Sequence, residues 1–166
     1  MKKLICNICS IALGVIAAIM AFMPMFDTFT TSGEKTIAYE KTFGLFGENE
    51  LHYLFSEYNP LLKTISMVLA CIAMALVVAI TLIAIIDMVK GKKAKNTGFK
   101  KLIGLLLIVI TIAFVVTTVL FLNAHTITGA ITKITTKISI SNWFTFLVVP
   151  VGFFLSGVFA LVADNK

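Results

Sequence analysis

The chain has 166 residues, of which 59% are hydrophobic, and its 14 basic and 8 acidic residues give a formal net charge of +6. Every basic residue is a lysine, whereas nucleic-acid-binding proteins use arginine forks to hold phosphate and guanine, so we do not expect a nucleic-acid partner. This length allows one membrane domain over residues 1–166 with one modest extramembrane unit.

Four long stretches of the sequence contain no charged residue. They cover residues 4–26, 64–86, 102–132 and 138–163. Each exceeds the roughly 20 apolar residues that a helix needs to cross a ~30 Å hydrocarbon core. The pattern predicts an all-α membrane protein, a four-helix transmembrane bundle. Its expected spans are about 4–26, 62–89, 102–124 and 142–163, with outer loops 27–61 and 125–141 and a cytoplasmic loop 90–101.

The lysines predict how the bundle is oriented. Lys2 and Lys3 precede the first span, and six more lysines crowd the loop between the second and third spans, namely Lys90, Lys92, Lys93, Lys95, Lys100 and Lys101. The segment 26–60 instead carries a net charge of −4. Because loops rich in lysine stay on the cytoplasmic side, we expect a plasma-membrane protein with both termini in the cytoplasm. We expect the loop lysines to fix this topology and to touch anionic lipid headgroups.

Small residues at helical spacing mark the faces on which the spans would pack. Within lipid, such residues allow close approach of two helix backbones. The first span contains Ser10, Gly14 and Ala18, and the fourth contains Gly152, Ser156 and Ala160. These stripes predict contacts within one bundle, with contacts to a neighbouring subunit as the alternative.

Asp87 is the acidic residue that lies closest to the interior of a span. Lys90 follows it by three residues near the cytoplasmic end, a spacing that predicts a surface pair reaching toward the headgroups. A proton or ion pathway would need an acidic residue near the middle of the membrane. The sequence has none there, which counts against a transporter.

The outer loops have the composition of β-strands. Residues 28–31 and 36–43 are rich in β-branched and aromatic residues and are separated by a Ser-Gly-Glu turn. Because a two-stranded hairpin is marginal in water, a strand over 134–140 is expected to complete a small extracellular β-sheet. Residues 50–58 have helical spacing, and Trp143 is expected at the outer membrane interface.

The chain resembles the claudins and their relatives in its expected topology, which has four spans, a larger first outer loop of strands and a smaller second outer loop. It also resembles them in two motifs. Claudins leave their first span through a Met-Pro pair and then reach a Gly-Leu-Trp motif. Here Met23-Pro24 is followed by Gly44-Leu45-Phe46 at a similar separation. The resemblance implies a claudin-like fold in which Phe46 inserts among the helix tops and anchors the sheet. The paired outer-loop cysteines of claudins are missing. The expected anchor or interaction residues are Phe43, Leu45, Phe46 and Trp143.

These features predict a non-enzymatic membrane scaffold or auxiliary subunit that acts through its outer sheet and its helix faces. Its expected partners are membrane lipids and either another membrane or envelope protein or a second copy of the chain. A bacterial immunity protein against a membrane-active toxin is the alternative, because small lysine-rich chains of this composition suit that role. A small oligomeric channel is the third. His52 and His125 lack the spacing of a metal site, and we predict no catalytic residue, cofactor, metal or small-molecule substrate.

Overall fold

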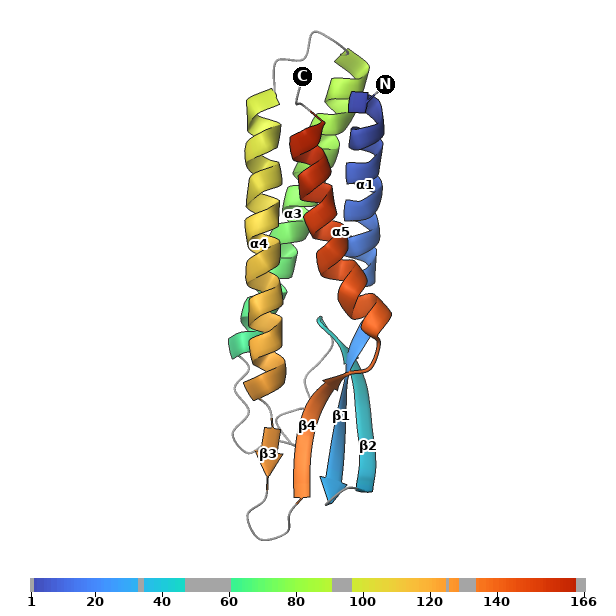
Figure 1. Cartoon of the computed structure of the whole chain (residues 1–166), viewed down its shortest axis with the longest axis vertical. Helices are drawn as coiled ribbons and strands as arrows, with labels where there is room; N and C mark the ends of the chain where they lie inside the picture. Colours follow the sequence, from blue (N-terminus) through green and yellow to red (C-terminus); the bar gives the residue numbers. More distant parts are fainter. Residues whose placement is uncertain are drawn as a thin grey trace.

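The computed structural model describes residues 2–32, 35–46, 61–90, 97–124, 126–128 and 134–163. Within these residues four long helices lie side by side, and a sheet stands at one end of the bundle, opposite both termini (Figure 1). The helices are α1 (Lys2–Met20), α3 (Leu61–Lys90), α4 (Thr97–Ala124) and α5 (Trp143–Val162). All four are long and apolar enough to cross a membrane, which confirms the predicted set of candidate spans.

The sheet has four strands in the order β2-β1-β4-β3, and every neighbouring pair is antiparallel. The strands are β1 (Pro24–Ser32), β2 (Lys35–Gly44), β3 (Thr126–Thr128) and β4 (Ile134–Ile140). The long pairing of β1 with β4, from Phe26 opposite Ile140 to Ser32 opposite Ile134, joins the two loops that were expected on the outside. The three predicted strands are present. The short strand β3 was not predicted.

Helix α1 is shorter than the sequence indicated. It ends at Met20, not near Phe26, and after one turn the chain continues as strand β1 from Pro24. Proline has no backbone N–H and disfavours helical geometry in the residue before it, here Met23. The same proline therefore ends the helix and starts the strand, and the sheet begins directly at the helix end.

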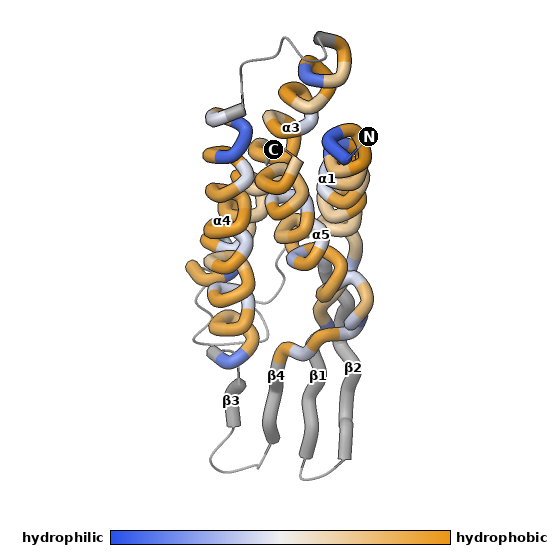
Figure 2. The backbone as a smooth tube through the Cα atoms, turned by 45° about the horizontal axis from the view of Figure 1, so that its top comes forward, coloured by the Kyte–Doolittle hydropathy of each residue, from blue (hydrophilic) through white to orange (hydrophobic). Residues whose placement is uncertain are grey.

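Hydropathy is distributed along the bundle as a membrane protein requires. The helices are hydrophobic along most of their length, and hydrophilic residues collect at the end that holds the termini, on α1, α3 and α4 (Figure 2). Within an apolar 18-residue stretch of each helix, 44% of the stretch is buried in α5, compared with 28% in each of α1, α3 and α4. Helix α5 is thus the central helix, packed on α1 and α4, while α1 and α3 touch over a smaller area.

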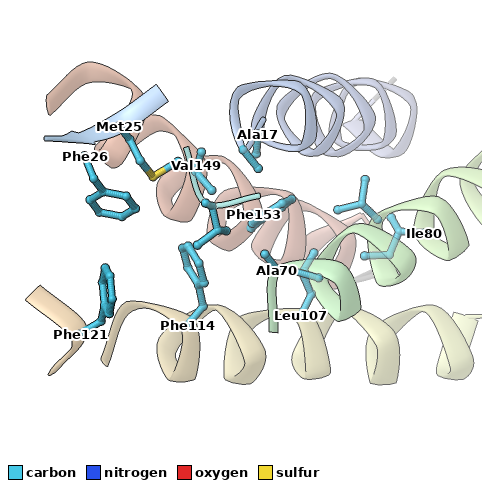
Figure 3. Close-up of a cluster of buried hydrophobic side chains, with 14 of the residues drawn as sticks. Ala17, Met25, Phe26, Ala70, Ile80, Leu107, Phe114, Phe121, Val149 and Phe153 are labelled. Atoms are coloured by element: carbon cyan, nitrogen blue, oxygen red, sulfur yellow. The ribbon is translucent and has the colours of Figure 1, made fainter. Parts of the chain in front are cut away.

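The centre of the bundle is filled with apolar side chains. Phe114, Leu107, Ile80, Val149 and Phe153 come from three helices and meet in one cluster (Figure 3). Each of them is at most 3% exposed, and Thr111, a polar residue buried at the same level, donates its hydroxyl hydrogen to the Leu107 carbonyl oxygen of its own helix.

The contact between α1 and α5 is built from the small residues that the sequence singled out. A Cβ atom on Gly14 would lie 2.9 Å from the Ser156 hydroxyl oxygen, and one on Gly152 would lie 2.8 Å from the Ala17 Cβ. Ser10 and Ser156 each donate a hydroxyl hydrogen bond of 2.8 Å to the other's backbone carbonyl. The two serines therefore join the helices where they approach most closely.

Two of the predicted packing residues face other helices. Ala18 lines a groove between α1 and α3, and its neighbour Ala17 takes the place against α5, since positions three and four residues apart share one helix face. Ala160 is fully buried and faces α4, where a Cβ on Gly104 would lie 3.2 Å from its own Cβ. Helix α5 thus uses one small-residue face for α1 and an adjacent one for α4.

We expect Gly157→Ala to destabilise the bundle by about 1–3 kcal/mol, the usual cost of overpacking a tight contact. A Cβ on Gly157 would lie 2.8 Å from the carbonyl oxygen of Gly104, a backbone atom that cannot move aside alone. The measurement is the thermal midpoint in detergent by circular dichroism. Gly98→Ala is the matched control because nothing lies within 4 Å of its added methyl group, so its midpoint should not fall. Equal midpoints for the two variants would contradict the close contact.

Candidate functional site

An aromatic junction joins the sheet to the helix ends. Phe26, the third residue of β1, is completely buried, and its ring makes edge contacts with Phe121 of α4 at 6.0 Å and with Phe146 of α5 at 6.4 Å between ring centres. Figure 3 shows Phe26 directed toward Phe121, with Met25 beside it. The backbone carbonyl of Met25 also accepts a hydrogen bond of 3.0 Å from the N–H of Ser141. Strand β1 is therefore packed on the bundle through the Phe26 side chain and joined by its backbone to the segment that leads from β4 into α5.

The Gly44-Leu45-Phe46 turn packs on the same end of the bundle. Leu45 is 1% exposed and belongs to the apolar core, whereas Phe46 is half-buried. The Phe46 ring stacks on Phe22, with ring centres 4.8 Å apart and an angle of 26° between planes. A Cβ on Gly44 would lie 3.2 Å from the carbonyl oxygen of Met23, so the turn passes close to the chain that leaves α1. Leu45 and Phe26 thus lie deeper than Phe46, the expected anchor.

The start of α5 presents an exposed aromatic pair beside this junction. Trp143 and Phe144 are 61% and 69% exposed, and the Trp143 ring makes an edge contact with Phe146 at 5.9 Å. The Asn142 side chain caps the helix by accepting a hydrogen bond of 3.1 Å from the N–H of Thr145. Rings at this level suit the boundary between lipid and water.

Several expected features fall outside what the structure describes. The backbone of Phe43 pairs with Phe26, but its side chain is not described. His52, His125, the 50–58 segment and the loop residues Lys92, Lys93 and Lys95 also lie outside the described residues. Among the residues that are described, no group of three or more histidine, cysteine, aspartate or glutamate side chains could hold a metal ion.

A cluster of charged and polar side chains lies buried at the opposite end of the bundle. Oδ2 of Asp87, on α3, is 3.6 Å from Nζ of Lys3 on α1 and 3.8 Å from Nζ of Lys100 on α4. Nζ of Lys100 also donates a hydrogen bond to Oδ1 of Asn7 on α1. Asp87, Lys100 and Asn7 are buried, and the Lys3 side chain is 43% exposed. One carboxylate therefore joins three helices.

This charged cluster corrects two expectations. Asp87 was expected at the surface with Lys90, but it is 5% exposed and pairs with Lys3 and Lys100; the side chain of Lys90 is not described. Lys100 was expected at lipid headgroups, but none of its surface is exposed. The physical reason is that an isolated buried charge is very costly, so Asp87 and Lys100 each provide the partner that allows the other to be buried.

Comparison with known proteins adds no relative. No protein-family model matches the chain, and none of the curated proteins is significantly similar to it. The fold and the two ends of the bundle define a class of protein in physical terms only: four candidate membrane spans, a sheet fixed to one end by buried aromatic rings, and a charged cluster buried at the other. A fold does not by itself give a function, so function is inferred from these sites.

Proposed function

We propose that this chain is a non-enzymatic integral membrane scaffold or auxiliary subunit that acts through protein contacts of its sheet and helix faces. The observation that carries the proposal is the aromatic junction. The buried Phe26 and Leu45 hold the sheet in one orientation on the helix ends, while Trp143, Phe144 and Phe22 remain exposed around it. A rigidly held surface with exposed aromatic rings is the kind of surface that protein partners use.

The proposal includes a claudin-like arrangement in a bacterial plasma membrane, with the sheet outside and both termini in the cytoplasm. Two features support this orientation. Both termini lie at the end of the bundle opposite the sheet (Figure 1), and that end carries Lys2, Lys3, Lys100 and Lys101. A sheet built from both loops, with a Gly-Leu-Phe turn packed against the helix ends, supports the claudin-like plan.

The interior of the bundle favours a scaffold over a channel. The charged cluster lies at one end, and the apolar layer around Leu107, Phe114 and Phe153 separates it from the sheet. An ion that crossed this layer would lose its hydration without gaining a polar partner from these side chains.

The proposal predicts that Phe46→Asp abolishes the association with the partner. A carboxylate at this site would disrupt the stack on Phe22 and expose the turn. The measurement is affinity purification from native membranes in a mild detergent, with mass and stoichiometry read by native mass spectrometry, together with protease protection of the sheet. Phe99→Asp is the matched control, because Phe99 is a 61% exposed ring near the start of α4, at the end of the bundle opposite the sheet.

Each outcome of this purification has a distinct meaning. A stoichiometric partner that is lost in Phe46→Asp but kept in Phe99→Asp supports an auxiliary role, and a toxin as that partner would identify an immunity protein. A monomer without a partner would contradict the proposal. An oligomer of this chain alone would favour self-assembly or a channel, to be tested by conductance.

A further inference from the structure

The strand registers of the sheet place four threonines in one row. Thr31 of β1 is paired with Thr36 of β2 and with Thr135 of β4. Thr135 is paired in turn with Thr128 of β3. The row therefore crosses all four strands in the spatial order β2-β1-β4-β3 (Figure 1). Because paired residues of neighbouring strands share one face of a sheet, these four positions, the threonine row, belong to the same face.

A second row on the same face combines aromatic and polar residues. Phe29, two positions from Thr31 along β1, is paired with Tyr39 of β2 and with Lys137 of β4. Lys137 is paired with Thr126 of β3. Residues two apart in a strand belong to the same face, so this aromatic and polar row lies beside the threonine row. Lys137 is the single charged residue of the two rows.

The opposite face of the sheet has a different composition and contributes to the core. Phe26 and Ile138 occupy alternate positions of β1 and β4, on the other face, and both are buried in the apolar core. On the face of the two rows, Asp27 is paired with Ser139 at the end nearest the bundle, where Asp27 is buried and Ser139 is half-buried. The two rows thus lie farther from the bundle than this pair.

The small amount of charge in the two rows limits the class of ligand. A ligand that carries phosphate groups is held by several lysine or arginine residues, and the two rows contain one lysine. The centre of a protein interface is mainly apolar and aromatic, which a row of four threonines is not. Hydroxyl groups both donate and accept hydrogen bonds, so the rows suit a neutral ligand that is itself rich in hydroxyls, such as a carbohydrate.

Spacing and shape favour an extended sugar chain. Neighbouring strands lie about 4.8 Å apart, so the threonine row repeats at close to the length of one sugar in a β-1,4-linked chain. Such a chain is a flat ribbon that carries hydroxyls along its edges and C–H groups on its broad faces. Phe29 and Tyr39 are paired on neighbouring strands, and the negative face of an aromatic ring attracts C–H groups. The two rows therefore match both kinds of surface on this chain.

We propose that the two rows bind a neutral, extended β-1,4-linked glycan beyond the membrane boundary. The inference goes beyond the proposed auxiliary function, because it gives the sheet a carbohydrate ligand in addition to a protein partner. It does not depend on that partner, since neither Phe46 nor Trp143 belongs to the two rows. The glycan-binding rows and the aromatic junction are then two separate contacts of one sheet.

The test measures sugar binding to the full chain in lipid nanodiscs by isothermal titration calorimetry. The probes are chitohexaose and cellohexaose, which are β-1,4-linked, and maltohexaose, which is α-1,4-linked and coiled. We expect heat of binding from at least one β-linked probe and none from maltohexaose. Thr31→Val with Thr135→Val should weaken binding about tenfold, as expected for the loss of two ordinary hydrogen bonds. Valine keeps the shape of threonine and favours a strand.

The matched control is Thr30→Val with Thr136→Val. These two threonines are also paired between β1 and β4, one position along each strand, and belong to the opposite face. The control should bind the β-linked probe as tightly as the unmodified chain, and circular dichroism should show the same thermal midpoint for both double variants. If the first double variant does not fold, Phe29→Leu provides the second measurement, because it removes the ring but keeps an apolar strand residue and should also weaken binding.

Three results would overturn the inference. The first is no binding of either β-linked probe, and the second is equal affinity for maltohexaose, which would remove the argument from an extended shape. The third is an equal loss of affinity in both double variants, because the binding would then not depend on the face of the two rows. In each case a protein partner that copurifies and depends on Phe46 would still support the proposed function.

Discussion

Replacing Asp87 with asparagine should destabilise the bundle by about 3–5 kcal/mol, the usual cost of removing one member of a buried ion pair. The substitution keeps the size of the side chain but removes the negative charge that lies between Lys3 and Lys100. Lys3 can turn toward solvent, because its side chain is 43% exposed. Lys100 has no exposed surface, so its charge would remain buried without the carboxylate.

The measurement is the thermal midpoint in detergent, with Lys2→Gln as the control. Lys2 is exposed and adjacent to Lys3, so removing its charge should leave the midpoint unchanged. Salt provides a second criterion. The Debye length falls to about 3 Å at 1 M salt, which weakens surface pairs but screens buried ones much less. A loss in Asp87→Asn that disappears at high salt, or no loss at all, would show that the cluster is hydrated.

The double variant Asp87→Leu with Lys100→Met separates charge pairing from packing. Replacing both members of a buried pair with apolar residues of similar volume is often neutral or stabilising, because no charge is left to desolvate. We expect the double variant to recover most of the stability that Asp87→Asn loses. If it were as unstable as the single variant, the side-chain shapes of the cluster would matter more than their charges.

The candidate spans could be predicted from the sequence because lipid imposes a simple rule of length and charge. Runs without charge are long enough to be recognised without any tertiary information, and the four helices of the structure match them. The end of α1 was misplaced because Met25 and Phe26 are as apolar as a span, although Pro24 already precedes them. Hydrophobicity alone does not distinguish a buried strand residue from a lipid-facing helical one.

The charged cluster could not be predicted, because it depends on three helices that are far apart in sequence. The sequence places Lys90 three residues from Asp87, and local spacing favoured that pair. The observed partners, Lys3 and Lys100, are brought to Asp87 only by tertiary packing. A partial signal existed: an acidic residue close to the end of a span needs a partner, and several lysines were candidates.

The junction was predicted in part. The Gly44-Leu45-Phe46 turn was recognised from its resemblance to claudins, whereas Phe26, whose side chain is fully buried, was assigned to the span. Its role depends on Phe121 and Phe146, which lie far away in the sequence. The small-residue stripes were recognised on both helices, but spacing alone could not decide between Ala17 and Ala18 at the contact with α5.

Replacing Phe26 with alanine should have the second large effect. The ring is fully buried and contacts both Phe121 of α4 and Phe146 of α5, so its removal leaves a cavity between these two rings. Removing a buried phenylalanine side chain typically costs about 3–5 kcal/mol. Phe144→Ala is the matched control, because an exposed ring at the same end should change stability by no more than about 0.5 kcal/mol.

Hydrogen exchange of the backbone amides shows which part of the molecule loses stability in Phe26→Ala. The backbone of Phe26 pairs with both Phe43 and Ile140, so Phe26 belongs to an inner strand of the sheet and to the junction at the same time. Small sheets need packing against another element to be stable. If the sheet depends on the junction, the amides of β1 and β4 should exchange faster in Phe26→Ala, while those of α4 and α5 keep their protection as a separate cooperative unit. Equal loss of protection in the sheet and the helices would instead mean that they unfold together, and the sheet could not respond to a partner independently of the bundle.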